Sequence, residues 1–171
     1  MSGTKSASKT LLVVIFLAIP CCRDLGTDPS LAFWEDSIME AVFRHVFVSN
    51  YSCQQQGAHV YFVGRYIPRD STHPGYYADL SEEFMARFRE NPTPVKKTSE
   101  CNWSGYGVFD KRTGESGLLF WIESIRELGS DQVEVSGGYF ESGISASTDR
   151  YIVKRVDGIW IVIRDYLTGI A

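Results

Sequence analysis

Apolar residues recur with two different periods along this chain, and the change of period separates a helical part from a strand-rich part. Between residues 29 and 48 the residues of one face are spaced three and four apart, which is the spacing of an amphipathic α-helix. These residues are Leu31, Trp34, Ile38, Ala41, Val42 and His45. Asp28 can accept hydrogen bonds from the first turn, and Pro29 suits the first helical position. The pattern predicts a helix over residues 29–48 with one buried face.

A strand and a second helix are expected next. Residues 59–67 are rich in β-branched and aromatic side chains, which favours a strand. Asp79 or Ser81 can then cap a helix whose first turn carries Glu82 and Glu83. Acidic side chains are favourable at that end of a helix because its free N–H groups carry partial positive charge.

From residue 95 onward the pattern is that of strands separated by turns. The clearest turn lies between the segments 151–156 and 159–164, where the pair Asp157-Gly158 favours the tight turn that matches strand twist. These segments are therefore predicted to form a hairpin. A second pair, at residues 137–138, places two glycines inside a strand pattern and indicates a bulge or a sharp bend. Helices followed by antiparallel strands predict an α+β fold, in which the helices pack on one face of a curved antiparallel sheet.

The first 22 residues have the pattern of an export signal. Lys5 and Lys9 precede an apolar run over residues 11–20, which is too short for a membrane-spanning helix of roughly 20 residues. We expect residues 1–22 to be a signal peptide that precedes a single domain.

The end of this signal allows two interpretations. Residues 17–21 resemble the lipobox of a bacterial lipoprotein signal, which makes Cys21 a candidate for lipidation, although Pro20 departs from the usual small residue. In plain secretion Cys21 is removed with the signal. Both place the protein outside the cytoplasm, as a periplasmic, extracellular or membrane-anchored domain, with residues 23–29 as a short linker and residues 30–171 as one α+β domain.

Charge and composition narrow the partners that can be expected. The net charge is −4 and no basic stripe is present, which disfavours nucleic-acid binding. A membrane would be contacted only through the lipid anchor. His59 and His73 lack a second ligand at metal-binding spacing, so no metal or other cofactor is expected. Aromatic residues make up 13% of the chain, which fits either a well-filled core or an aromatic-lined pocket.

Two cysteines remain in the body of the chain, Cys53 and Cys101. In an oxidising compartment an even pair at this separation is expected to form a structural disulfide. The apolar run Leu118–Ile122 also allows a homodimer that pairs through the sheet.

The order of helix, short strand, helix and long meander ends on a recognisable set of residues, namely Tyr151, Val153, Arg155, Asp157, Gly158, Trp160 and Val162. Over about residues 30–168 this order resembles the nuclear transport factor 2-like superfamily, also described as SnoaL-like or ketosteroid-isomerase-like, and the related cystatin-like folds. The resemblance implies a pocket between the helices and the sheet. Members use such a pocket as isomerases, dehydratases, small-ligand carriers or protein-binding modules, so the fold alone does not choose among them.

An enzyme of this kind would need an acid or a histidine in that pocket as a general base, with a tyrosine or second acid beside it. The candidates for such catalytic roles are His45, Glu141, Asp165 and Tyr166. For each of them a solvated or structural role is the simpler interpretation. We therefore expect a binding or accessory domain for a small ligand or an envelope protein, with a small-molecule isomerase or dehydratase as the alternative.

Overall fold

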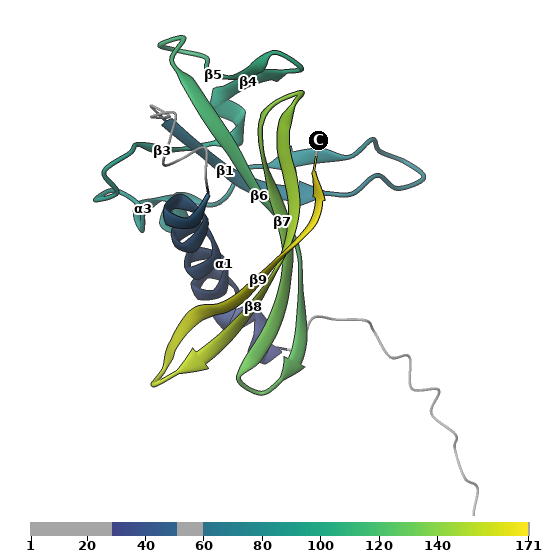
Figure 1. Cartoon of the computed structure of the whole chain (residues 1–171). Coiled ribbons are helices and arrows are strands. Elements are labelled where there is room, and N and C mark those ends of the chain that lie inside the picture. Colours follow the sequence, from purple (N-terminus) through teal and green to yellow (C-terminus); the bar gives the residue numbers. More distant parts are fainter. Residues whose placement is uncertain (1–28, 51–59, 171) are drawn as a thin grey trace, which may run out of the picture.

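The computed structural model describes residues 29–50 and 60–170, and strands predominate in that part of the chain (Figure 1). These described residues include two α-helices, α1 (Pro29–Ser49) and α3 (Glu82–Ala86), and a 3-10 turn at Thr98–Glu100. The strands are β1 (Val60–Ile67), β2 (Tyr76–Ala78), β3 (Val95–Lys97), β4 (Cys101–Ser104), β5 (Gly107–Asp110), β6 (Ser116–Gly129), β7 (Gln132–Ser142), β8 (Ser145–Val156) and β9 (Ile159–Ile170). Helix α1 and strand β1 confirm the predictions for residues 29–48 and 59–67.

All strands belong to one nine-stranded sheet with the main order β2-β1-β6-β7-β8-β9. Strands β6 to β9 form an antiparallel meander, whereas β1 runs parallel to both β3 and β6. The expected class, α+β with helices packed on one face of a curved antiparallel sheet, is therefore wrong. The sheet is mixed because the chain between β1 and β6 crosses over and returns in the same direction as β1. Strands also outweigh helices among the described residues.

The second predicted helix is shorter than its sequence pattern indicated. Ser81 caps it, since its Oγ accepts a hydrogen bond from the backbone N–H of Phe84 at 3.1 Å. Turns replace the helix after Ala86, yet Phe88 in those turns is still buried. A short capped helix therefore suffices to place Phe84 and Phe88 in the core.

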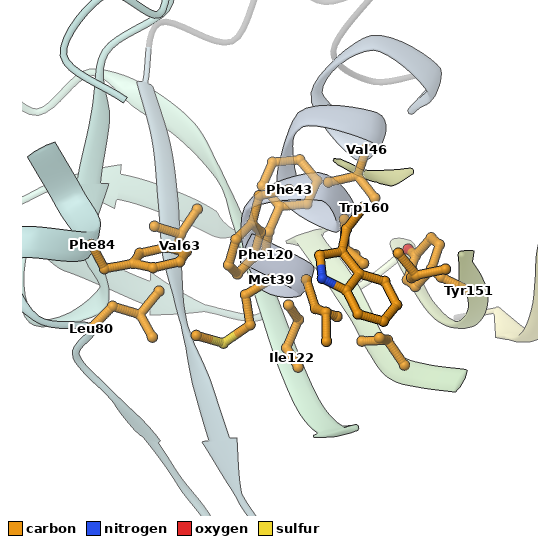
Figure 2. Packing of buried hydrophobic residues seen from close by; sticks show 14 of the residues in the cluster. Met39, Phe43, Val46, Val63, Leu80, Phe84, Phe120, Ile122, Tyr151 and Trp160 are labelled. Carbon is orange, nitrogen blue, oxygen red and sulfur yellow. The ribbon is translucent and has the colours of Figure 1, made fainter. Parts of the chain in front are cut away.

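Helix α1 packs its apolar side against one face of the sheet, here called the inner face (Figure 2). The helix contributes buried Ile38, Met39, Val42, Phe43 and Val46 to this core. The sheet and α3 contribute further buried side chains, among them Val63, Phe84, Phe120, Ile122, Tyr151, Val153 and Trp160. The spacing of the five helical residues is the predicted three-and-four pattern, so amphipathicity directs this helix to the sheet.

The predicted hairpin at the end of the chain is confirmed. Strands β8 and β9 pair antiparallel, with Val156 opposite Ile159 across the turn. Asp157 and Gly158 both have positive φ values, 50° and 84°, as a primed two-residue turn requires. At the other predicted irregularity, Gly137 and Gly138 pair regularly with β8, and the bulge lies in β6 directly after the partner of Gly137, between Ile122 and Ser124.

Candidate functional site

Two of the predicted catalytic candidates meet in the structure. The imidazole Nε2 of His45, on α1, lies 3.2 Å from Oδ2 of Asp165 on β9. Both side chains retain contact with solvent, 30% exposed for His45 and 56% for Asp165. The guanidinium of Arg164, the preceding residue in the sequence, donates to the Tyr166 hydroxyl at 2.9 Å.

Strand β8 extends this pair into a line of polar groups on the inner face. Tyr151 stands opposite Asp165 in the ladder, and its ring contacts the His45 ring edge-on at 6.1 Å between centroids. Its hydroxyl donates to Asp149, which also accepts a hydrogen bond from Ser147 Oγ at 2.6 Å. Burial raises the pKa of Asp149, and burial together with Asp149 and Asp165 raises the pKa of Tyr151. Tyr151 therefore stays a neutral phenol at physiological pH.

The other two candidates are not part of this line. Glu141, on β7, accepts a hydrogen bond from Ser145 Oγ at 2.7 Å. Tyr166, on β9, pairs with Arg150 of β8 and directly follows Asp165 in the sequence. Because neighbouring residues of a strand face opposite sides, Tyr166 lies on the other face of the sheet. The two cavities described beside α1, bordered by Trp160 and by Phe47, have no lining from His45 or Asp165. The line of polar groups therefore links α1 to the β8–β9 hairpin.

A cavity with aromatic walls lies on the opposite, outer face of the sheet, and we call it the outer cavity. Its volume is about 540 Å³. Its lining residues are Tyr66, Gly75, Tyr76, Tyr77, Thr98, Ser99, Cys101, Trp103, Lys111, Leu119, Trp121, Glu123 and Thr148. Small-ligand sites are typically concavities of 300–1,000 Å³ lined mainly by apolar and aromatic side chains with a few polar groups, and the outer cavity has these properties.

Aromatic side chains from four strands form the walls. Tyr77 lies at the centre of this group, with ring centroids 5.3 Å from Tyr66, 5.5 Å from Trp121 and 5.7 Å from Trp103. Their strands explain the grouping, because Tyr66 pairs with Tyr77 across β1 and β2, and Trp121 stands on the neighbouring strand β6 opposite Gly64. Alternate residues of a strand face the same side, so these rings share the outer face.

Two lining residues of the outer cavity, Cys101 and Leu119, belong to a small apolar cluster that also contains Val60, Phe62 and Val108. Gly138 has a special role beside it, because a Cβ built there would lie 2.8 Å from Cζ2 of Trp121. The absence of a side chain at Gly138 is therefore what lets the indole lie close against β7. Trp103 remains 55% exposed at the edge.

Several polar groups around the outer cavity have partners within the protein. Thr98 Oγ1 and the Ser99 backbone N–H both donate to Asp79, at 2.9 and 2.8 Å. Lys111 Nζ donates to the Ser99 carbonyl at 2.6 Å. Glu123 differs, because its carboxylate makes no hydrogen bond or ion pair with the rest of the described residues.

Two titratable groups of the outer cavity are shifted toward their neutral forms. Burial raises the pKa of Tyr77 to about 12, with smaller contributions from Tyr66 and Cys101. Burial also raises the pKa of the Cys101 thiol to about 11, and its Sγ lies 3.2 Å from the Thr98 carbonyl. A neutral phenol and a neutral thiol are poor general bases and poor nucleophiles, so these groups suit binding more than catalysis.

Several sequence predictions fall outside the described residues. The signal segment, Cys21 and Cys53 all lie there, so the export signal, the lipidation and the Cys53–Cys101 disulfide stay predictions. Among the described residues, no helix combines the length and apolarity needed to cross a membrane. That same part of the chain has no group of three acidic, histidine or cysteine side chains placed to hold a metal ion.

The outer cavity was not among the sites predicted from the sequence. The only signals for it were the high aromatic share and the apolar run Leu118–Ile122, which a core explains equally well. Comparison with protein-family models, with curated proteins and with solved structures gives no match. Function must therefore be inferred from the geometry of the site.

Proposed function

We propose that this chain is an exported binding domain whose outer cavity accommodates one small ligand, or one protruding side chain of an envelope protein. The observation that carries the proposal is the cavity of about 540 Å³ with aromatic walls on the outer face. Its size and lining match those of small-molecule sites. Tyrosine and tryptophan also favour binding because they offer a large apolar surface while losing little conformational freedom.

Binding is favoured over catalysis by the state of the polar groups. Packed apolar side chains form the core between α1 and the sheet, and the two cavities beside α1 are not lined by His45 or Asp165, so we do not assign to this side the pocket that an isomerase or dehydratase would use. In the outer cavity, Tyr77 and Cys101 are held neutral by burial, which raises their pKa values. We therefore do not propose a reaction for either face of the sheet.

Export is the second part of the proposal, and the apolar run over residues 11–20 supports it. If Cys21 carries a lipid, the domain is held at a membrane surface with its binding cavity free. Fractionation of cells that express the full chain and the Cys21→Ser variant tests the anchor. A lipidated protein is expected to leave the membrane fraction after the substitution, and retention of the variant would exclude the anchor.

The binding proposal is tested with the four tryptophan side chains as reporters. Trp103 and Trp121 line the outer cavity, whereas Trp34 and Trp160 contact each other beside α1 at 6.5 Å between ring centroids. The indole N–H resonances are followed by NMR while choline, glycine betaine, 3,3-dimethyl-1-butanol, phenol and methyl glucoside are added one at a time.

At least one probe is expected to shift the resonances of Trp103 and Trp121 with saturation and leave those of Trp34 and Trp160 in place. If every probe left the Trp103 and Trp121 resonances unchanged, the outer cavity would not be a binding site for small molecules. A probe that shifted only Trp160 would instead identify the cavity between α1 and the β8–β9 hairpin, which Trp160 lines.

A further inference from the structure

We infer that the ligand group held in the outer cavity is an alkylated ammonium, such as the trimethylammonium group of choline-type compounds. This inference rests on the proposed binding function and assigns its chemical class. Three observations carry it, namely the angles between the aromatic rings, the position of Glu123 and the place of Lys111 relative to Glu123.

The rings around Tyr77 stand at steep angles to one another. The interplanar angle is 52° to Tyr66, 58° to Trp121 and 85° to Trp103. Such rings present several faces and edges to one volume instead of one flat platform. A sugar ring is favoured by a flat exposed aromatic face, whereas a rounded cation is attracted by several ring faces that surround it. The arrangement therefore resembles an aromatic cage.

The exposed carboxylate of Glu123, which has no hydrogen-bond or ion-pair partner among the described residues, stands next to these rings. On β6, Ile122 and Ile125 both pack in the inner core, although strict alternation would separate two residues spaced by three. The bulge between Ile122 and Ser124 makes Glu123 an extra residue without a partner in the β6–β7 ladder, which lets Ile122 and Ile125 face the same side. Glu123 itself lines the outer cavity. The parallel register that pairs Arg65 with Ile122 places Glu123 beside Tyr66.

The other acidic side chains nearby, unlike Glu123, have partners among the described residues. Asp79 accepts hydrogen bonds from Thr98 and Ser99, and Asp110 is paired with Lys96, which lowers the pKa of Asp110 to about 2. A neutral ligand that covered Glu123 would remove water from an unpaired carboxylate, which is costly. A cation would supply the missing partner.

The one lysine among the lining residues, Lys111, lies away from Glu123. Its Nζ is bonded to Ser99, and its charge acts on Cys101, which packs in the same cluster as Leu119. Glu123 lies four residues beyond Leu119 on β6, so about 13 Å separates these two residues at the rise of an extended strand. The outer cavity therefore has Glu123 toward one end and Lys111 toward the other, with the aromatic rings between them, so a ligand cation belongs among the rings on the Glu123 side.

The experiment compares choline with 3,3-dimethyl-1-butanol, which has the same shape but a neutral carbon in place of the ammonium nitrogen. Affinities are measured by calorimetry at low and high salt, with the indole resonances confirming the site. Choline is expected to bind at least about tenfold more tightly than its neutral analogue, since cation–π attraction and the ion pair with Glu123 act only on the charged probe. High salt is expected to reduce this difference.

The Glu123→Gln variant keeps the shape of the side chain and removes its charge. This variant is expected to lower the affinity for choline toward that for the neutral analogue and to leave the affinity for the analogue unchanged. Glu127→Gln, at an exposed position on the same strand, is the matched control and is expected to bind both probes as the original protein does.

The outcomes separate the two proposals. Equal affinity for both probes at the outer cavity would overturn the cationic ligand and leave the binding function standing. Choline binding that Glu123→Gln does not weaken would likewise overturn the inference, because the carboxylate is part of it. If no probe of the wider panel shifts the Trp103 and Trp121 resonances, the binding function itself fails and the cationic ligand fails with it.

Discussion

Replacing Gly138 by alanine tests whether the close packing under the outer cavity is as tight as the structure describes. A Cβ at Gly138 would lie 2.1 Å from the Ser147 carbonyl oxygen and 2.8 Å from Trp121 Cζ2, whereas ordinary contacts are 3.4–4 Å. The added methyl group would overlap the carbonyl oxygen by more than 1 Å. Because that oxygen belongs to the backbone of β8, relief requires movement of a strand, not only rotation of a side chain.

The expected cost follows from this overlap. Adding a methyl group to a well-packed site typically costs about 1–3 kcal/mol of folding free energy. For a chain of this size each kcal/mol lowers the Tm by roughly 2–4 °C, so Gly138→Ala is expected to lower it by about 2–12 °C. The Trp121 indole must also shift, which would change its fluorescence.

Thermal and urea unfolding followed by circular dichroism measure the effect. Gly129→Ala is the matched control, because a Cβ built there meets no atom within 4 Å. Its stability is expected to stay within about 0.5 kcal/mol of the original protein. If Gly138→Ala unfolded at the same temperature as Gly129→Ala, the close approach of β6, β7 and β8 at the outer cavity would be refuted.

Three further predictions concern the core, the buried acid and the cysteines. Phe43→Ala, at a side chain only 1% exposed, is expected to cost about 3–5 kcal/mol, against less than about 0.5 kcal/mol for Phe33→Ala at 75% exposure; equal urea midpoints would contradict the packing of α1. Burial raises the pKa of Asp149, so the folded state keeps its proton at pH values where the unfolded chain has lost it. The original protein should therefore lose stability relative to Asp149→Asn as the pH rises above the ordinary aspartate pKa of 3.8, and a Tm difference that is constant from pH 3 to 7 would contradict this. The Cys101 thiol of the outer cavity is the reduced form; in the oxidised protein, peptide mapping without reduction is expected to show Cys101 linked to Cys53 by a bridge worth about 4 kcal/mol, and two free thiols in the secreted protein would exclude the bridge.

Local patterns in the sequence were sufficient for several elements. The three-and-four spacing predicted α1, and the Asp157-Gly158 pair predicted the β8–β9 hairpin with its turn. In each case the decisive interactions lie within the element or across one tight turn. The parallel pairing of β1 with β6 has no such local signal, because it depends on a crossover through β2, α3, β3, β4 and β5.

The meeting of His45 with Asp165 shows a second limit. Trp160 and Val162 face the core, so strict alternation would turn Arg164 inward and Asp165 outward. The irregularity in the β8–β9 ladder leaves Ile163 without a partner, which brings Asp165 to the inner face. An isoleucine in an apolar strand gives no sign that it will be the extra residue. The same holds for Glu123 in the bulge of β6.

The pair Trp103→Ala and Tyr106→Ala tests whether the outer cavity binds ligands through its aromatic walls. Both residues are exposed aromatic side chains, at 55% and 94%, but only Trp103 lines the cavity. The probe that shifts the Trp121 indole most is titrated into the original protein and both variants by calorimetry. We expect a loss of affinity of at least about fivefold for Trp103→Ala and no loss for Tyr106→Ala. Equal affinity in all three proteins would contradict it.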